Sequence, residues 1–344
     1  MARIAFVVTP CLPIGTKGYS GLEKVAYLLA NEVGKKHEVT VFAAKGSEKG
    51  NFNLVEVLKP GYNTPFLNRE LIFMALINDK LENFDLIDFH IHYFHIVPNK
   101  FYRKAVFSSH GYLDFFPKES LGVVKIFARS KAHAELLSKR FNAEIDYCYN
   151  PVDVDKFKVE EKEDYLLFLS RICREKGAFN FLEIAKEFPN ERFIMAGDDK
   201  PEHGADPLFV SIVLRNLTKN IEYLGEITEE KKIDLLSRAK ALIVPYGKDI
   251  TGEIYFEVFG IFIVEALASG TPCFVIDSGG VSEILNGKGL TEYGFVANNL
   301  DELKNALNEF LKGKIDFNPK KLRERANRFN PETIAEEYLK KINL

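Results

Sequence analysis

The sequence has few cysteines and no closely spaced pair of them. Its four cysteines are scattered at Cys11, Cys148, Cys173 and Cys273, and no C-x-x-C pattern occurs. This spacing does not fit a redox or zinc motif, and two of the four lie in or beside apolar, strand-like runs. We therefore expect all four to be reduced core residues in a reducing compartment.

Long apolar runs are also absent, as is an excess of charge of one sign. No run reaches the ~20 apolar residues of a membrane-spanning helix. The first run, RIAFVVTP, is too short for a signal peptide, so we expect a cytoplasmic protein. The net charge of −3 argues against a general nucleic-acid binder, and no nucleic-acid partner is expected.

The pattern along the chain is typical of an α/β protein. With 344 residues, 46% of them hydrophobic and 28% charged, the chain is long for one core and suggests two domains of ~150–180 residues. Short β-rich apolar runs alternate with helical periodicity, which predicts parallel sheets with helices on both faces. Strands are expected near 2–9, 37–43, 85–90, 104–109, 123–129, 144–148, 164–170, 191–196, 220–224, 240–244, 272–276 and 293–297. Helices are expected near 22–34, 177–187, 207–217, 229–238, 261–268 and 299–312.

The domain boundary is expected in YNPVDVDKFKVEEKEDY (149–165), which holds a proline and a charge run. This divides the chain into Rossmann-like domains at 1–152 and 153–328, followed by a helix at 329–344. On that helix Ile334, Tyr338 and Ile342 share one face. From periodicity alone, this face fits packing on the helix's own domain as well as on the first domain.

The most informative stretch is EIYFEVFGIFIVEALASGTPCFVIDSGGVSE (253–283), in which seven residues separate Glu257 from Glu265. The run IFIVEALA predicts a short helix that stops at SGTP, and CFVI predicts a buried strand. Unpaired N–H groups at the helix start form an anion site, and Gly260 allows close approach to the backbone. The two carboxylates would lie roughly 10 Å or more apart, too far to act on one bond. That distance suits a long ligand with an anionic middle, such as a sugar nucleotide.

With its FG, EA-A-GTP and GG-SE strings, this stretch resembles the nucleotide-sugar site of the retaining GT-B glycosyltransferases of family 4, which carry an E-x7-E motif. The resemblance covers nearly the whole chain. It implies two Rossmann-like domains facing across a cleft, with the C-terminal helix crossing back to the N-terminal domain. It further implies retaining, metal-independent transfer of a hexose from a nucleoside-diphosphate sugar to an acceptor hydroxyl on a glycan, lipid or small molecule. No cofactor is expected.

In the second domain, SRICREKG (170–177) follows a strand and precedes a helix, where cations and helix N–H groups can neutralise a diphosphate. It resembles the family's R-x-x-x-x-K-G string, although Ser170 stands where glycine is usual. The alternative is a solvated charged turn. The resemblance assigns Arg171 and Lys176 to the diphosphate and Glu265 to the ribose hydroxyls, and it makes Gly197 the best candidate on the base side.

In the first domain, KGYSGLEKV (17–25) resembles the family's GG-x-E loop, with Ser20 in place of the first glycine. The alternative is a plain helix-entry turn capped by that serine. His110 emerges at a strand end and fits the histidine that the family places beside the donor sugar. The predicted catalytic residues are Glu257, His110, Arg171 and Lys176, and the predicted donor-binding residues are Gly21, Gly197, Phe259, Gly260, Ile261 and Glu265.

Two patterns could bind metal, but neither is favoured. His90 and His92 would face the same way on a strand, with His95 nearby, yet no adjacent carboxylate or cysteine completes a ligand set. The DVD at 153–155 lies in the linker and matches the family's N-x-x-D segment instead. No metal is therefore expected.

Other interpretations stay open. Residues 100–140 carry nine Lys or Arg against three acidic side chains, which fits an acidic acceptor, peripheral contact with an anionic membrane surface, or a solvated face. The fold could also serve as a sugar-nucleotide-binding module without turnover, or as a GT-B sugar-nucleotide epimerase. An NAD-dependent enzyme is disfavoured because no G-x-G-x-x-G follows Val8.

Overall fold

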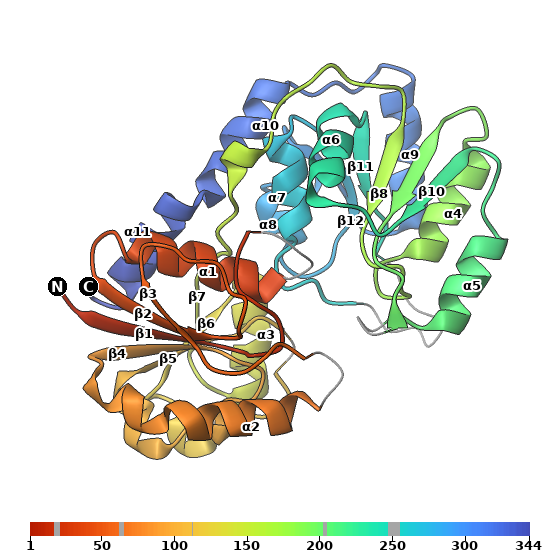
Figure 1. The fold of residues 1–344 in the computed structure, drawn as a ribbon. Helices are drawn as coiled ribbons and strands as arrows, with labels where there is room; N and C mark the ends of the chain where they lie inside the picture. Colours follow the sequence, from red (N-terminus) through yellow and green to blue (C-terminus); the bar gives the residue numbers. More distant parts are fainter. Residues whose placement is uncertain (17–20, 62–64, 112, 202–204, 247–254) are drawn as a thin grey trace. The chain divides into compact units, whose positions relative to one another are not determined.

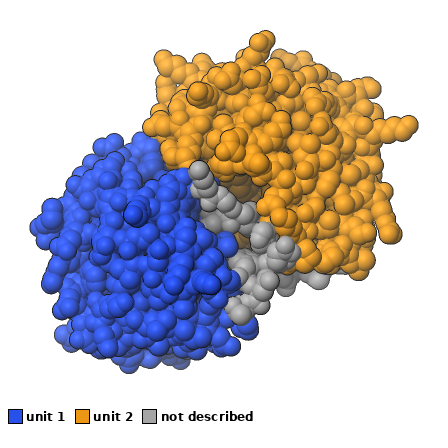
Figure 2. Space-filling view, viewed as in Figure 1, with its two compact units in different colours: residues 1–152, 329–344 blue, residues 153–328 orange. Residues whose placement is uncertain are grey.

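A computed structural model describes residues 1–16, 21–61, 65–111, 113–201, 205–246 and 255–344. The chain divides into two compact units, shown in blue and orange in Figure 2. Unit 1 contains residues 1–152 and 329–344, and unit 2 contains residues 153–328. Among the described helices, none is long and apolar enough to cross a membrane.

Unit 1 is built on a seven-stranded sheet of order β3-β2-β1-β4-β5-β6-β7, in which all neighbours are parallel. Its central strands are short apolar runs that are buried on both faces, as parallel strands between helical layers must be. The strands are β1 (Arg3–Val8), β2 (Glu38–Ala43), β3 (Asn53–Glu56), β4 (Leu86–His90), β5 (Ala105–Ser108), β6 (Lys125–Ala128) and β7 (Asp146–Tyr147).

Helices cover both faces of this sheet. The helices α1 (Gly21–Val33) and α11 (Pro331–Lys341) share one apolar cluster with Phe6 and Val41. On the other face, α2 (Phe66–Ile77) and α3 (Lys131–Phe141) pack around Phe89 and Ile87. Short 3-10 helices lie at Asn78–Asn83, Phe94–Ile96, Asn99–Lys104 and Lys118–Ser120.

The C-terminal segment returns to unit 1, as the expected fold requires. In Figure 1 the blue α11 lies beside the red α1, and the two helices are in contact. Tyr338 is fully buried against Phe6 and Phe127, and its hydroxyl donates to Asp88 Oδ2 at 2.7 Å. The helix face predicted from periodicity therefore packs on the first domain.

Unit 2 has the strand order β10-β9-β8-β11-β12-β14-β13, which matches that of unit 1 over the first five strands and interchanges the last two. Only the short β13 is antiparallel among the described pairs. Its strands are β8 (Leu166–Leu169), β9 (Phe193–Ala196), β10 (Ile221–Gly225), β11 (Ala241–Val244), β12 (Cys273–Ile276), β13 (Gly289–Leu290) and β14 (Gly294–Ala297). Its helices are α4 (Ala178–Glu187), α5 (Pro207–Arg215), α6 (Glu229–Arg238), α7 (Ile261–Ala268), α8 (Val281–Ile284), α9 (Leu300–Leu311) and α10 (Pro319–Ala326), with a 3-10 turn at Val154–Lys156. The expected α/β fold of two doubly wound sheets is confirmed.

Each sheet has one point where its strand order reverses, and this point positions the site. The reversal lies between β1 and β4 in unit 1 and between β8 and β11 in unit 2. Ligands of open α/β sheets bind outside the carboxyl ends of the strands at such a point. His90 ends β4, and Ser170 directly follows β8. The predicted residues therefore follow strands at or next to these reversals.

Candidate active site

The loop after β8 is closed against the end of β11 by a glycine. Gly177 has φ +76°, and a Cβ added there would lie 1.9 Å from the carbonyl oxygen of Pro245. Asn180, in the first turn of α4, donates to the same oxygen at 2.9 Å. Only glycine allows this approach, which brings Lys176 beside Tyr246 at the reversal point of unit 2.

Lys176 and Glu257 form an ion pair, with 2.7 Å between Nζ and Oε2. Their side chains are only 13% and 9% exposed. The hydroxyl of Tyr246 donates to the same carboxylate oxygen at 2.7 Å, and Lys176 Nζ also donates to the Tyr255 hydroxyl at 3.1 Å. The ammonium group lies 4.3 Å from the centre of the Tyr255 ring, a cation–π distance. Two residues predicted from separate motifs thus form one cluster.

The pair remains charged despite its burial. Burial lowers the pKa of Lys176, but Glu257 and Tyr255 raise it by more, so the pKa lies above its ordinary value. Burial likewise raises the pKa of Glu257, and Lys176 and Tyr246 bring it below its ordinary value. Burial, followed by Glu257, raises the pKa of Tyr246 well above 10, so this phenol keeps the proton that it donates.

The backbone around Glu257 is held by the turn that follows β12. Gly280 N–H donates to the carbonyl of Glu257 at 2.8 Å. Gly279 has φ +59°, and a Cβ there would lie 2.1 Å from that same oxygen. Ser278 bridges the segment by accepting from Glu257 N–H and donating to the carbonyl of Tyr255. The glycine pair of the GG-SE string therefore fixes the position of Glu257.

The helix α7 begins as predicted, at Ile261 after Gly260. Gly260 has φ +103° and offers no side chain to cap the helix, while its carbonyl accepts from Ile263 N–H at 3.0 Å. The backbone N–H of Phe259 lies 3.4 Å from Glu257 Oε1. The predicted anion site and the carboxylate that precedes it are therefore adjacent.

Glu265 lies within α7 and forms a second ion pair. Its Oε1 is 2.7 Å from Lys232 Nζ on α6, and Lys232 also contacts Glu229 at 3.1 Å. Burial lowers the pKa of Lys232, while Glu265 and Glu229 raise it to a net value above the ordinary one. The lysine fixes the orientation of the Glu265 carboxylate and compensates its charge.

Gly197 supports the neighbouring loop. Its φ is +159°, and an added Cβ would lie 1.6 Å from the carbonyl of Ser170. Arg171, the next residue, is half-buried. On the same side, the Tyr223 hydroxyl donates to Asp199 at 2.6 Å. Gly197 therefore allows β9 to end in close contact with the backbone of Ser170, the residue before Arg171.

In unit 1, the predicted histidine belongs to a chain of polar contacts. His110 is half-buried after β5, and its Nε2 lies 2.8 Å from His90 Nδ1. His90 Nε2 lies 3.2 Å from Asp88 Oδ2, and both of these residues are fully buried. Burial, followed by Arg129, lowers the pKa of His110 well below 6.5, so its ring is neutral.

The predicted loop at 17–25 is described only in part. Gly21 is the exposed first residue of α1, and Glu23 is buried in its first turn. Ser20 and the three residues before it lie outside the described residues.

The histidines of the suspected metal pattern face different partners. His90 contacts Asp88 and His110, whereas His92 lies past the end of β4 and its Nδ1 is 2.7 Å from Glu70 of α2. The expectation that His90 and His92 face the same way is wrong, because the strand ends at His90. Within the described parts of the chain, no group of three or more His, Cys, Asp or Glu residues could hold a metal ion.

Family models match both halves of the chain. The model described as Glycosyl transferases group 1 matches residues 151–332, which is more than half of the sequence. The chain belongs to this family. The model described as Glycosyltransferase Family 4 matches residues 19–156. The resemblance recognised from the E-x7-E stretch is therefore confirmed for both halves of this family 4-type glycosyltransferase.

Individual relatives are more distant. An uncharacterised glycosyltransferase of Methanocaldococcus jannaschii is 25% identical over 37% of this chain and 30% of its own length. The 2-deoxystreptamine N-acetyl-D-glucosaminyltransferase of Niallia circulans is 28% identical over 35% of this chain and 29% of its own. The matches thus span less than a third of the curated relatives' length.

Solved structures resemble the whole chain. AviGT4, a glycosyltransferase involved in avilamycin A biosynthesis, covers 100% of this chain and 97% of its own at 20% identity, with a TM-score of 0.71. Anabaena HepE in complex with UDP and glucose covers 100% of both chains at 16% identity, with a TM-score of 0.72. Sucrose-phosphate synthase from Thermosynechococcus elongatus covers 100% and 98% at 17% identity, with a TM-score of 0.76. These similarities show that this glycosyltransferase has the two-domain GT-B fold.

Sequence reasoning missed three side chains of this candidate site. Tyr246 lies two residues after β11, at the reversal point, a place that would have indicated it. Tyr255 lies two residues before Glu257, and Lys232 lies on α6 with no local motif. The lysine could not have been found without the tertiary pairing to Glu265.

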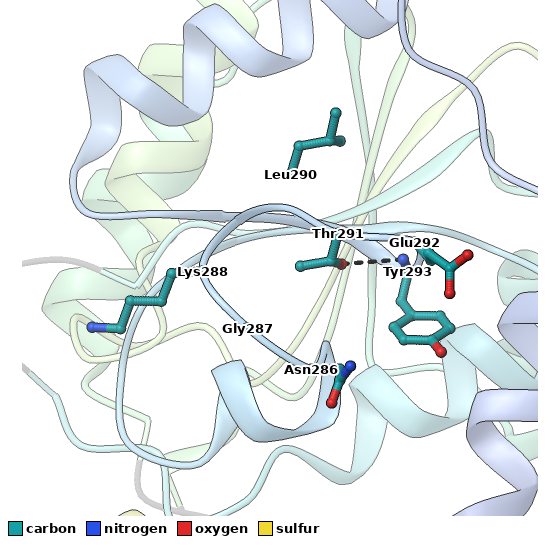
Figure 3. Close-up of a pocket in the computed structure, with 7 residues that line it drawn as sticks. All are labelled: Asn286, Gly287, Lys288, Leu290, Thr291, Glu292 and Tyr293. Carbon is teal, nitrogen blue, oxygen red and sulfur yellow. Dashed lines mark hydrogen bonds between the residues drawn. The ribbon is translucent and has the colours of Figure 1, made fainter.

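One cavity of unit 2 lies apart from the predicted site residues. A cavity of about 440 Å³ in unit 2 is bordered by the turn after α8 and by β13 (Figure 3). There Thr291 Oγ1 accepts from the N–H of Tyr293, and no predicted site residue lines the cavity.

Five of the nine cations in the basic stretch at 100–140 are buried or bound to other groups of the protein. Arg129 is buried, and Lys104 donates to three backbone carbonyls. Three other cations of the stretch pair with acids, namely Lys100 with Glu82, Lys125 with Asp146 and Arg140 with Asp114. The charge count of the sequence therefore overstates the basic surface in this region.

Proposed function

We propose that this glycosyltransferase is a retaining hexosyltransferase. It moves a hexose from a nucleoside-diphosphate sugar to a hydroxyl of a glycan, lipid or small molecule. The observation that carries the proposal is the buried Lys176–Glu257 pair with its two tyrosines, at the point of unit 2 where α/β folds bind ligands. One relative is named as an N-acetyl-D-glucosaminyltransferase, and HepE is described in complex with UDP and glucose, which favours a UDP-linked sugar.

Lys176 would contact the diphosphate without leaving Glu257. An ammonium group has three N–H donors, and two of them point to Glu257 and to the Tyr255 hydroxyl. The third would meet a phosphate oxygen. Arg171, from the same loop, would add a bidentate donor, and the uncapped amides after Gly260 would complete the anion site. This positive charge would stabilise the departing nucleoside diphosphate.

Glu257 would orient the hexose and not attack it. Its Oε2 already accepts from Lys176 and Tyr246, and its Oε1 accepts from Phe259 N–H at 3.4 Å. Oε1 has a second lone pair, which would accept from a sugar hydroxyl. Glu265, oriented by Lys232, would bind the ribose hydroxyls. In this mechanism positioning and stabilisation of the leaving group lower the barrier, and the leaving phosphate takes the proton of the acceptor hydroxyl.

In unit 1, His110 would contact the transferred sugar, and Gly21 would lie on the acceptor side. A lipid or membrane-bound acceptor is favoured by one feature of this unit. On α2, Leu71, Ile72 and Leu76 are 46%, 56% and 52% exposed, which is unusual for three large apolar residues on one helix. We expect the protein to sediment with anionic lipid vesicles and the triple variant L71Q/I72Q/L76Q to stay in the supernatant. If the wild-type protein and the triple variant sediment equally, the exposed face of α2 does not bind the membrane, and this argument for a lipid acceptor fails.

Thermal unfolding tests the donor and the metal together. UDP-, GDP- and ADP-sugars are added in EDTA, and release of the sugar is followed for each ligand that shifts Tm. A donor at about 100 times its Kd stabilises by ~2.7 kcal/mol, a shift of a few degrees. Lys176→Met should lose the shift, whereas Lys186→Met, which removes an exposed lysine of α4, should keep it.

The outcomes separate the candidate functions. A selective shift with sugar release in EDTA supports a metal-independent transferase. A shift without release or transfer to any acceptor supports a binding module, and conversion of the sugar to its epimer supports the epimerase. Restoration of activity only by Mn²⁺ or Mg²⁺ would overturn metal independence.

A further inference from the structure

A line of polar side chains crosses the interior of unit 1 and ends at His110. The hydroxyl of Tyr338, on α11, donates to Asp88 Oδ2 at 2.7 Å, and the hydroxyl of Ser108 donates to the same oxygen at 3.3 Å. His90 Nε2 faces that oxygen at 3.2 Å, and His90 Nδ1 faces His110 Nε2 at 2.8 Å. Burying polar side chains costs free energy, and a sheet face that served only to pack against helices would not need them.

The contacts determine where the ring protons lie. Oδ2 of Asp88 already accepts from two hydroxyls, so a neighbouring ring nitrogen is favoured when it carries a proton and disfavoured when it presents a lone pair. The contact with His90 lacks the geometry of a hydrogen bond, but this electrostatic preference holds at 3.2 Å. A His90 ring with a single proton would therefore carry it on Nε2, and its Nδ1 would be an acceptor.

The same argument determines where the proton of His110 lies. Because His90 Nδ1 is an acceptor at 2.8 Å, the nitrogen opposite it must donate, and the proton of neutral His110 lies on Nε2. The other nitrogen of His110, Nδ1, then carries only a lone pair. The Asp88 carboxylate and the two imidazole rings thus form a series, and it resembles the way in which a carboxylate fixes the tautomer of a catalytic imidazole.

Four charged or titratable groups lie around His110 and add to the effect of burial on its pKa. They are His90 of β4, His92 just after that strand, Arg129 after β6 and His133 of α3. Burial disfavours the imidazolium most, and the buried guanidinium of Arg129 disfavours it next. His110 thus stays an uncharged acceptor near neutral pH.

We propose that Asp88 and His90 are positioning residues that hold the proton of His110 on Nε2, so that its bare Nδ1 accepts a hydrogen bond from a hydroxyl of the transferred sugar. The relay itself stands on the geometry of unit 1. The identity of the hydroxyl donor rests on the proposed function. The C-terminal helix takes part in the relay through Tyr338, which holds the carboxylate in place.

The tautomer can be read directly in the intact chain. With ¹⁵N-labelled histidine, long-range ¹H–¹⁵N correlations distinguish the two neutral tautomers and the cation for each of the seven histidines. We expect His110 to be protonated on Nε2 alone and to remain neutral from pH 8 down to pH 6. A proton on Nδ1, or a cation at pH 6.5, would overturn the proposal.

A pair of variants tests the role of His90. His90→Leu removes the acceptor, so His110 should populate both tautomers, and kcat/KM for the donor should fall at least about tenfold. The matched control is His95→Leu, which removes a neighbouring ring that contacts Tyr93 and Phe115, and it should leave the tautomer and kcat/KM unchanged. If folded His90→Leu keeps the wild-type tautomer and rate, the relay does not exist.

The two arms separate failure of this inference from failure of the proposed function. If no sugar nucleotide supports transfer while the wild-type tautomer is as stated, the function is wrong and the relay holds. If transfer occurs while the proton of His110 lies on Nδ1, the relay is wrong and the function holds.

Discussion

Lys176 and Glu257 lie 81 residues apart in sequence, yet they form a 2.7 Å ion pair in the interior of unit 2. Two tyrosine hydroxyls complete their coordination. Taking two charges out of water is costly, and their attraction offsets this cost only when the geometry is good and the remaining donors are satisfied. The pair is therefore neutral as a whole, with both of its charges held in fixed positions at the reversal of the strand order in unit 2.

The first prediction concerns the coupling of this pair. Lys176→Met and Glu257→Gln should each lower the free energy of unfolding of unit 2 by ~3 kcal/mol, because each leaves a buried partner uncompensated. The double variant should lose at least ~1 kcal/mol less than the sum of the two. Urea unfolding at pH 7 measures all four proteins.

The exposed pair Arg192–Glu222, at 2.8 Å in the same unit, is the control for this cycle. Its side chains are about half exposed, and its coupling should stay below ~1 kcal/mol. Equal coupling in the two pairs would show that burial does not strengthen the Lys176–Glu257 interaction.

The second prediction separates a steric clash from backbone strain. Gly177 and Gly313 have φ +76° and +72°, but an added Cβ would meet Pro245 O at 1.9 Å in the first and nothing within 4 Å in the second. Gly313→Ala should cost ~1 kcal/mol for the left-handed conformation alone. Gly177→Ala should cost clearly more and reduce donor binding. Similar midpoints of denaturation for the two variants would contradict the close approach.

The third prediction concerns Lys232. If it orients Glu265 toward the ribose, Lys232→Met should raise KM for the donor by about tenfold, a loss of ~1.4 kcal/mol, with little change in kcat. Lys231→Met, on the same helix, removes an exposed lysine that pairs with Asp234 and should leave both constants unchanged. A fall in kcat at constant KM would place Lys232 in the chemical step instead.

The fourth prediction is a pH dependence of stability. Burial, followed by Arg129, lowers the pKa of His133 from 6.5 to about 4. The unfolded chain therefore binds a proton at this histidine at a higher pH than the folded chain does. Stability should fall as the pH decreases from about 6.5 to about 4, by about 3 kcal/mol from this group.

His133→Asn tests this assignment, because its side-chain oxygen can still accept from Arg129 N–H, as Nδ1 of His133 does at 3.1 Å. The free energy of unfolding of the variant should decrease less steeply over the same pH range. Parallel curves for the two proteins would assign the acid sensitivity to other groups, with His110 the next to examine.

Much of the fold could be predicted because its signals are local. The run IFIVEALA predicts α7 at its observed bounds, since Gly260 precedes it and Ser269-Gly270 end it. In contrast, α2 was not predicted, because its apolar residues lie on all sides and three of them are exposed. The strand β3 was missed as well, since only four residues form it at the edge of the sheet.

The site residues were predicted individually but not as partners. A motif identified Lys176, and another identified Glu257, yet nothing local shows that they touch. The same holds for Glu265 with Lys232, on two different helices, and for His110 with His90. These pairings depend on which strand ends the fold brings together, and they became visible only in three dimensions.

The place of α11 has a consequence for how the chain is made. Residues 329–344 complete the apolar cluster of unit 1, but the ribosome synthesises them after all of unit 2. Domains usually fold from the N-terminus onward during synthesis. Here we expect the reverse order, in which the continuous unit 2 matures first. The sheet that begins the chain would keep one apolar face open until Tyr338 emerges, and through that interval it would be the part of the nascent protein in most need of a chaperone.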